Sequence, residues 1–374
     1  MEKITLIATA AFGLEAVTKR EIIALGYEVT DAKDGRIEYK GDLRAIVRSN
    51  LWLRSADRVY IKLADFTAKT FDELFTATEK LPWEEWIKED SCFIVNGSSA
   101  RSVLHSVPAC QSIVEKAIIK RLSGIYGIEQ FSKTGPRISI RFMLQKDECI
   151  MLIDTSGAGL HKRGYRVKTV AAPIKETLAS AMVQLSFFKE GRLMADPFCG
   201  SGTIAIEAAM LARNIAPGLS RDFDARAWRI IPEELWKEEK ELAFKAINND
   251  AQFVIQASDI DPKAVKAARE NAIEAGVDDC IDFKVMDARK LFAEEEKGMI
   301  ITNPPYGVRI GEEKLNQQIY RSLAAFIKQN PTWSLFLITS DKGFEKAFGR
   351  NADRRRKLYN GRIESCYYQY YGEK

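Results

Sequence analysis

A glycine-rich segment at residues 193–203 constrains the fold of this chain more than any other feature. An apolar run ends at Asp196, Gly200 and Gly202 follow within six residues, and an apolar-periodic stretch begins after Thr203. This order predicts a strand, a glycine turn and a helix, as in the first βα unit of a doubly wound parallel sheet. Such a unit binds a nucleotide-like ligand at the carboxyl edge of the sheet. Glycine lets the backbone approach that ligand closely, and we expect Thr203 to cap the helix.

The residues of this segment limit which class of ligand it can bind. No lysine follows the glycines as in a Walker phosphate loop, and the three-glycine spacing of dinucleotide-binding turns is not met. Asp196 would repel a pyrophosphate but attracts a cation, which favours S-adenosylmethionine with its sulfonium and ammonium groups. We expect the donor to be held here by Asp196, Pro197, Phe198, Gly200, Ser201, Gly202 and Thr203.

A second motif, Thr302 to Gly307, follows an apolar run that predicts the end of a buried strand. Its two prolines cannot continue a strand ladder and fix their own backbone angles, so they form a rigid elbow. Asn303 offers a side-chain carbonyl, Pro304 a main-chain carbonyl and Tyr306 a flat face. Two acceptors on the hydrogens of an aromatic NH₂ group would make its delocalised lone pair available for reaction. We therefore predict a catalytic elbow of Asn303, Pro304, Pro305 and Tyr306, whereas an isolated Asn-Pro-Pro would be an ordinary turn.

Acidic residues end two further predicted strands. Asp259 lies one βα unit after the glycine turn, where a carboxylate suits the ribose hydroxyls of a nucleoside. We assign Ile260 to the adenine face and Asp261 to the N-cap of a helix that starts at a proline. Asp287, followed by Ala288, ends the third strand and is placed to accept from the adenine amine. Each acid alone could be a cap, but three strand ends at one sheet edge favour a ligand site.

The segments Asp196–Thr203 and Asn303–Gly307 together resemble the Rossmann-fold amino-methyltransferases that carry an N-terminal RNA-binding THUMP domain. The similarity is greatest to bacterial 23S ribosomal RNA guanine-N2 methyltransferases, which have relatives acting on tRNA and are often labelled N6-adenine-specific DNA methylases. It covers the whole chain and implies S-adenosylmethionine as cofactor. It also suggests that the helix opening near Thr177 lies over the donor.

The resemblance implies an α/β fold in which a seven-stranded Rossmann-like methyltransferase sheet follows a ferredoxin-like and THUMP α+β region. We expect a ferredoxin-like part at 1–57, a THUMP RNA-binding domain at 58–157, a linker at 158–174 and a class I methyltransferase domain at 175–374. The last strands are expected to form a hairpin about Asn360-Gly361, with one antiparallel strand in the parallel sheet.

Basic residues gather in three places, which favours a polyanion although each run alone is usually a solvated face. One place is the predicted THUMP domain and another is the linker, while residues 354–357 form the third. The predicted RNA contacts are Lys116, Lys120, Arg121, Lys133, Arg137, Arg141, Lys162, Arg163 and Arg166.

Composition excludes several classes of protein. The 374 residues, 46% of them hydrophobic, predict two or three domains. No run of about 18 apolar residues could span a membrane and no signal segment is present, so we expect a cytoplasmic protein. Six scattered cysteines and two histidines disfavour a metal site, a disulfide framework and a Ser-His-Asp triad. No obligate protein partner is evident.

We therefore expect an enzyme that transfers a methyl group directly to the exocyclic amine of an unpaired or flipped base. The resemblance favours N2 of a guanine in 23S ribosomal RNA and a role in rRNA processing. A tRNA guanine-N2 enzyme and an N6-adenine DNA or RNA enzyme are the alternatives within the class. Outside it stand a protein-glutamine methyltransferase and an RNA-binding protein without catalytic activity.

Overall fold

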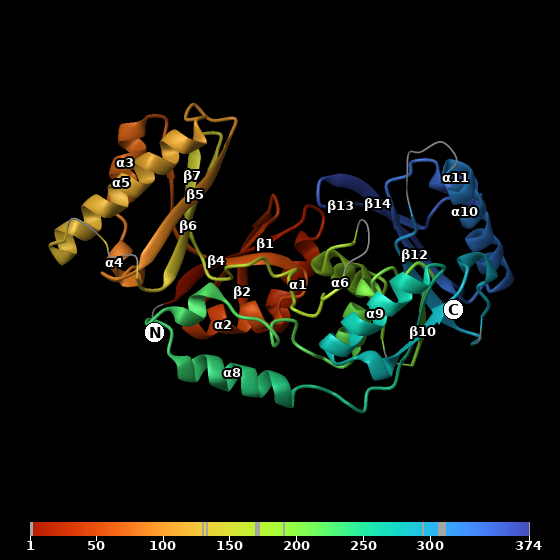
Figure 1. Ribbon diagram of the computed structural model, residues 1–374. Helices are drawn as coiled ribbons and strands as arrows, with labels where there is room; N and C mark the ends of the chain where they lie inside the picture. Colours follow the sequence, from red (N-terminus) through yellow and green to blue (C-terminus); the bar gives the residue numbers. More distant parts are fainter. Residues whose placement is uncertain are drawn as a thin grey trace.

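Two seven-stranded sheets, one in each half of the chain, organise the molecule (Figure 1). The computed structural model describes residues 3–128, 131, 134–168, 173–189, 191–293, 295–305 and 312–373. Within these ranges the first sheet has the order β2-β3-β1-β4-β7-β6-β5 and the second has the order β10-β9-β8-β11-β12-β14-β13. The predicted α+β region and the α/β region that follows it are therefore both present.

The N-terminal part of the first sheet is built by a hairpin and two helices. The turn of the hairpin is Asp34-Gly35, where both residues have positive φ angles of 51° and 73°. Asp42 caps the second helix by accepting from the backbone N–H of Ala45 at 2.9 Å. The elements are β1 (Ile4–Ala10), α1 (Glu15–Ala24), β2 (Glu28–Lys33), β3 (Arg36–Gly41) and α2 (Leu43–Trp52).

One long strand, β4 (Ala56–Thr67), joins this part to the predicted THUMP region. It pairs antiparallel with β1 on one side and with β7 on the other, so the two regions share a continuous sheet. Figure 1 shows α3 and α5 on one face of the far end of this sheet. The remaining elements are α3 (Phe71–Glu79), α4 (Trp83–Trp86), β5 (Cys92–Ala100), α5 (Val107–Tyr126), β6 (Arg137–Gln145) and β7 (Glu148–Asp154).

The second sheet has the topology that the resemblance implied. Strands β8 to β12 run parallel, and β14 pairs antiparallel with both β12 and β13, which confirms the predicted closing hairpin and its antiparallel strand. Its strands are β8 (Leu193–Asp196), β9 (Val254–Asp259), β10 (Ile281–Val285), β11 (Gly298–Thr302), β12 (Ser334–Thr339), β13 (Arg354–Asn360) and β14 (Ile363–Tyr370). The helices of this half are α6 (Glu176–Leu185), which precedes β8, and α7 (Thr203–Ala212), α8 (Glu233–Lys245), α9 (Pro262–Ala275), α10 (Glu312–Gln329) and α11 (Phe344–Phe348), with 3₁₀ turns η1 (Asp224–Ala227), η2 (Asp278–Cys280) and η3 (Ala288–Lys290).

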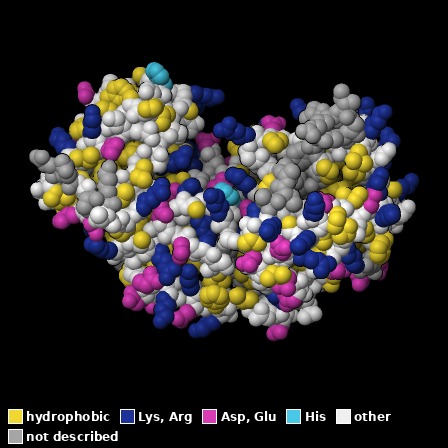
Figure 2. All heavy atoms as spheres, viewed as in Figure 1, with side chains coloured by type: hydrophobic (Ala, Val, Ile, Leu, Met, Phe, Trp, Pro, Cys, Tyr) yellow, Lys and Arg dark blue, Asp and Glu magenta, His cyan; other side chains and the backbone are white. Residues whose placement is uncertain are grey.

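Helix α8 ties the two halves together. It runs beneath α2 in Figure 1, and the buried carboxylate of Glu239 pairs with Arg44 at 2.7 Å and Arg48 at 2.9 Å. Figure 2 shows a hollow between the far end of the first sheet and the second half, with Lys and Arg side chains along its border. Among the described helices, none is long and apolar enough to cross a bilayer.

Candidate active site

The glycine turn lies where β8 leaves the second sheet. Cys199 donates its backbone N–H to the carbonyl of Ser258, which holds the turn against the end of β9. Gly200 and Gly202 have φ angles of 53° and 83°, which other residues rarely adopt. Gly202 is the N-cap of α7, so the cap expected from Thr203 is not formed. A Cβ atom on Gly202 would lie 3.0 Å from Cβ of Ala268, which shows that this glycine allows α7 to pack against α9.

Asp259 at the end of β9 organises the same edge. Its Oδ2 accepts from the backbone N–H of Gly200 at 3.0 Å, and its Oδ1 accepts from that of Asp261 at 3.0 Å. Asp261 in turn caps α9 by accepting from the N–H of Lys263 at 2.8 Å, as predicted. Ile260 between them is 66% exposed and lies at the mouth of the cavity described next. A single carboxylate thus fixes the glycine turn and the start of the next helix.

A cavity of about 640 Å³ opens at this edge, a size typical of small-molecule sites. It collects most of the residues that the sequence predicted for the donor and for the catalytic elbow. These are Asp196, Pro197, Phe198, Gly200, Ser201, Thr203, Asp259, Ile260, Asp287, Ala288, Asn303, Pro304 and Pro305. Tyr306, the remaining residue of the predicted elbow, lies outside the described residues, as does Lys133 of the predicted RNA contacts.

Two buried oxygens in this cavity have no hydrogen-bond partner among the described residues. Thr302 donates its hydroxyl to Oδ1 of Asp196 at 2.6 Å, but Oδ2 of that carboxyl has no partner, and neither has Oδ1 of Asn303. The pKa of Asp196 is raised to about 7, mainly by burial and to a smaller extent by the charge of Asp259, against the lowering effect of the Thr302 hydrogen bond. Buried acceptors without partners are costly, so they mark where a ligand would donate.

The sequence did not indicate two polar residues of this site. Thr302 is fully buried at the end of β11, and its position directly before Asn303 was the available signal. Asn316 of α10 is 4% exposed and lines the cavity. A polar residue on the apolar face of that helix, one turn before Tyr320, could have been recognised.

Known proteins with the same domains identify the family. Residues 163–369 match the methyltransferase domain family described as RMKL-like, residues 5–60 match the RlmL ferredoxin-like domain and residues 68–154 match the THUMP domain. The chain belongs to the RMKL-like methyltransferase family. It is 47% identical to "Putative RNA methyltransferase YpsC" of Bacillus subtilis, with 100% of this chain and 97% of that protein aligned.

Two further similar proteins show how the chain relates to larger and to solved relatives. The chain is 32% identical to Ribosomal RNA large subunit methyltransferase K/L of Psychromonas ingrahamii over 95% of its own length, but it spans only 48% of that protein. The crystal structure of SMU.472 complexed with SAH has a TM-score of 0.95 and 39% identity, and covers 100% of this chain and 99% of that one.

The cavity of this family member fits S-adenosylmethionine, the donor on which these methyltransferases depend. The buried carboxyl of Asp196 lacks a donor on one oxygen, and Asp259 stands near enough to affect its pKa. Two neighbouring acids favour a cationic ligand over a phosphate. No group of three His, Cys, Asp or Glu side chains suited to a metal occurs within the described ranges.

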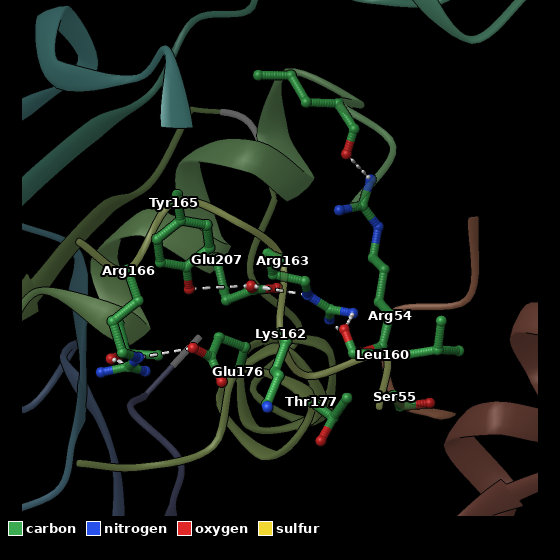
Figure 3. A network of polar contacts seen from close by, with 12 residues as sticks. Arg54, Ser55, Leu160, Lys162, Arg163, Tyr165, Arg166, Glu176, Thr177 and Glu207 are labelled. Carbon is green, nitrogen blue, oxygen red and sulfur yellow. Dashed lines mark hydrogen bonds and ion pairs between the residues drawn. The ribbon is translucent and has the colours of Figure 1, made fainter. Parts of the chain in front are cut away.

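Arg166, predicted to contact RNA, is instead part of the donor site (Figure 3). It donates to Oε1 of Glu176 at 2.7 Å, to the Ser201 hydroxyl at 3.0 Å and to the Thr203 hydroxyl at 2.9 Å. It also donates to the carbonyl of Ile174 at 3.0 Å. Since Ser201 and Thr203 line the cavity, Arg166 holds the glycine turn, and four of its five N–H groups are bound within the protein.

Arg163, also predicted to contact RNA, is buried between the two halves of the molecule. It donates to Glu207 of α7 at 3.3 Å and to the carbonyls of Arg54 and Leu160 (Figure 3). Tyr165 donates its hydroxyl to the same Glu207 oxygen at 3.1 Å. The side chain of Arg163 is 2% exposed, so it cannot reach a phosphate and the prediction is wrong.

Two residues predicted to contact the methyl donor make other contacts in the structure. Thr177 is 2% exposed, lies outside the cavity lining and donates to Asp57 of the N-terminal part at 3.4 Å, so its contact with the donor stays a prediction. Asp287 lines the cavity, but its carboxylate pairs with Arg289, and this pairing lowers its pKa. An adenine amine would therefore have to share Asp287 with Arg289.

The remaining basic residues differ in exposure. Lys116, Lys120, Arg137 and Lys162 are exposed, whereas Arg121 and Arg141 are partly buried. Arg121 is bound to Glu84 at 2.6 Å, and Lys120 pairs with Glu79 at 3.1 Å. Pairs between half-exposed side chains contribute little and open easily. These residues stay predictions for RNA contact.

Proposed function

We propose that this methyltransferase acts on the exocyclic amine of a base in structured RNA, with N2 of a guanine in 23S ribosomal RNA as its preferred target. The observation that carries the proposal is Asn303, which follows β11 at the rim of the donor cavity. Its Oδ1 is buried without a partner in the described part of the chain, and an amine N–H is the donor that it lacks.

The proposed reaction divides the cavity between two ligands. Asp196, the glycine turn and Asp259 hold the donor, with Asp259 on the ribose. S-adenosylmethionine supplies the electrophilic methyl group. Asn303 and the main-chain carbonyl of Pro304 accept the two hydrogens of the target amine and hold its nitrogen in line with the methyl group.

Orientation supplies much of the acceleration. The base must be unpaired or flipped to enter this cavity, and Tyr306 is proposed to stack on it. The proton leaves to water after transfer.

RNA as the substrate is supported by the THUMP match at residues 68–154 and by the exposed basic residues of α5 and β6. Two relatives are named for RNA, YpsC as an RNA methyltransferase and the K/L protein for the large ribosomal subunit. The second name favours ribosomal RNA. A guanine N2 of tRNA and an adenine N6 of RNA or DNA are the competing targets.

The test is tritium transfer from labelled S-adenosylmethionine to unmethylated total RNA and, separately, to DNA, followed by nucleoside analysis. Asn303→Ala should lose transfer by at least about 100-fold while binding S-adenosylhomocysteine normally in calorimetry. Asn351→Ala, at an exposed position beyond the second sheet's last helix, is the matched control and should keep full activity.

Each outcome decides the substrate. Label in N2-methylguanosine of the 23S fraction supports the full proposal, and label confined to tRNA changes the RNA while keeping the mechanism. Label confined to DNA adenine contradicts the RNA assignment. Donor binding without label in either nucleic acid would point to a protein substrate.

A further inference from the structure

The hairpin formed by β13 and β14 carries a concentration of positive charge that the donor site does not use. Residues 354–364 contain five basic side chains, Arg354, Arg355, Arg356, Lys357 and Arg362, and one acidic side chain, Glu364. Their net charge equals the +4 of the entire chain. Such a local excess at one sheet edge is the electrostatic signature of a polyanion site.

Strand registers place the tip of this hairpin at the active-site edge. Thr302 of β11 pairs with Leu337 of β12, and Leu337 pairs with Tyr368 of β14. Tyr368 in turn pairs with Arg355 of β13. Residues that follow Arg355 on β13 therefore extend past the sheet on the same side as Asn303, which follows Thr302. The turn Asn360-Gly361 and Arg362 project furthest, and Figure 1 shows this tip beside the N-terminal part.

The N-terminal part adds an aromatic ring to the hairpin. Phe12, in the loop between β1 and α1, packs edge-on against Tyr359 with ring centroids 6.0 Å apart, yet it remains 58% exposed. Arg356 donates from Nη1 to the carbonyl of Gly13 at 3.3 Å, and a Cβ on Gly13 would lie 2.5 Å from the carbonyl oxygen of Lys357. The loop is thus fixed on β13, and an exposed aromatic face stands beside the basic strand.

Several of these basic side chains have no carboxylate partner among the described residues. Arg355 pairs with Glu345 and Lys357 with Glu364, but Arg354 and Arg362 form no ion pair with any described residue. Burial lowers the pKa of Arg356, and the nearby charges of Arg354 and Arg20 lower it further. Cations gathered without counter-charges are stabilised when a phosphate binds between them.

We infer that Phe12, Tyr359, Arg354 and Arg362 form a second RNA-binding surface, which holds the single-stranded segment next to the flipped target base. This hairpin surface rests on the proposed RNA substrate. Bases stack on the rings of Phe12 and Tyr359, and phosphates bind Arg354 and Arg362, as in other single-strand sites. The chain would then hold its RNA at the THUMP region and again beside the elbow, across the hollow of Figure 2.

The test measures binding of a fluorescent RNA hairpin with a single-stranded tail to the full chain as a function of salt. Arg354→Gln/Arg362→Gln should reduce the slope of log Kd against log salt by about 1.4, the value for two phosphate contacts on a single strand. Lys237→Gln/Lys245→Gln on α8 removes the same charge at exposed positions and should leave the slope unchanged. Arg354→Lys/Arg362→Lys should restore it.

A second pair of variants tests the contribution of base stacking to RNA binding. Phe12→Ala should weaken RNA binding by about tenfold at fixed salt. Phe244→Ala on α8 removes a ring of nearly equal exposure, 59% against 58%, and should have no effect. All variants should bind S-adenosylhomocysteine as the wild type does.

The outcomes separate this inference from the proposed function. A wild-type protein that does not bind RNA overturns both. Wild-type binding with equal slopes for the β13 and α8 charge variants overturns the hairpin surface alone, and the charges would then serve only to keep an exposed edge strand from pairing with other chains.

Discussion

Arg166 and Ser201 connect the segment between the two halves of the molecule with the donor site. Nη1 of Arg166 donates to the Ser201 hydroxyl at 3.0 Å, and the same guanidinium also holds Thr203 and Glu176. The glycine turn therefore depends on a side chain from outside its own βα unit.

Arg166→Ala is expected to weaken donor binding. Losing charge-assisted hydrogen bonds to Ser201 and Thr203 should raise the Kd for S-adenosylhomocysteine by about tenfold, measured by calorimetry. Affinity for RNA should stay unchanged, because four of the five N–H groups of Arg166 are already bound within the protein. A variant with normal donor affinity and weakened RNA binding would restore the original prediction of an RNA contact.

Asp259→Asn tests how the glycine turn is fixed. Both carboxylate oxygens accept backbone N–H groups, from Gly200 and Asp261, and an amide would place its NH₂ against one of them. We expect the Kd for S-adenosylhomocysteine to rise by at least about tenfold, with a thermal shift on ligand addition that shrinks in proportion. Asp250→Asn, at an exposed site before β9, should behave as the wild type.

The raised pKa of Asp196 predicts a specific pH dependence of stability. Its folded-state pKa of about 7 lies above the ordinary 3.8, so the folded protein keeps a proton that the unfolded chain loses. The resulting stabilisation is fully present below about pH 4 and is lost as pH rises through 7.

Asp196→Asn mimics the protonated carboxyl and provides the comparison. Between pH 4 and 7 the wild type should lose up to about 1.4 kcal/mol per pH unit of unfolding free energy relative to this variant. Denaturant unfolding at a series of pH values measures the difference. Parallel profiles for the two proteins would show that Asp196 is ionised throughout.

The buried pair of Arg163 and Glu207 should be costly to break. Arg163→Ala leaves a buried carboxylate without its cation, and we expect the free energy of unfolding to fall by about 3–5 kcal/mol. Arg163→Met/Glu207→Gln should recover much of this loss, since the amide carbonyl still accepts from Tyr165. An equal loss in the single and double variants would mean that packing of Arg163, rather than its charge, holds the halves together.

The local sequence determined strands, turns and helix caps in both halves of the chain. An apolar run followed by glycines makes a strand and a turn whatever surrounds it, and Asp42 and Asp261 cap helices through backbone N–H groups two or three residues away. The meeting of Asp196, Asp259 and Asn303 at one edge also followed from sequence, because parallel strands align their carboxyl ends.

Tertiary structure alone decided the roles of the charged residues between the halves. The sequence predicted that Arg163 and Arg166 contact RNA and that Thr177 contacts the donor. In the structure Arg163 donates to Glu207, Arg166 to Ser201 and Thr177 to Asp57, and each of these partners is far away in the sequence. Burial and pairing depend on what folding brings alongside, and no short segment contains that information. The same holds for the hairpin of β13 and β14. Its charges lie beside the elbow only because of the registers of three strand pairs, β11 with β12, β12 with β14 and β14 with β13.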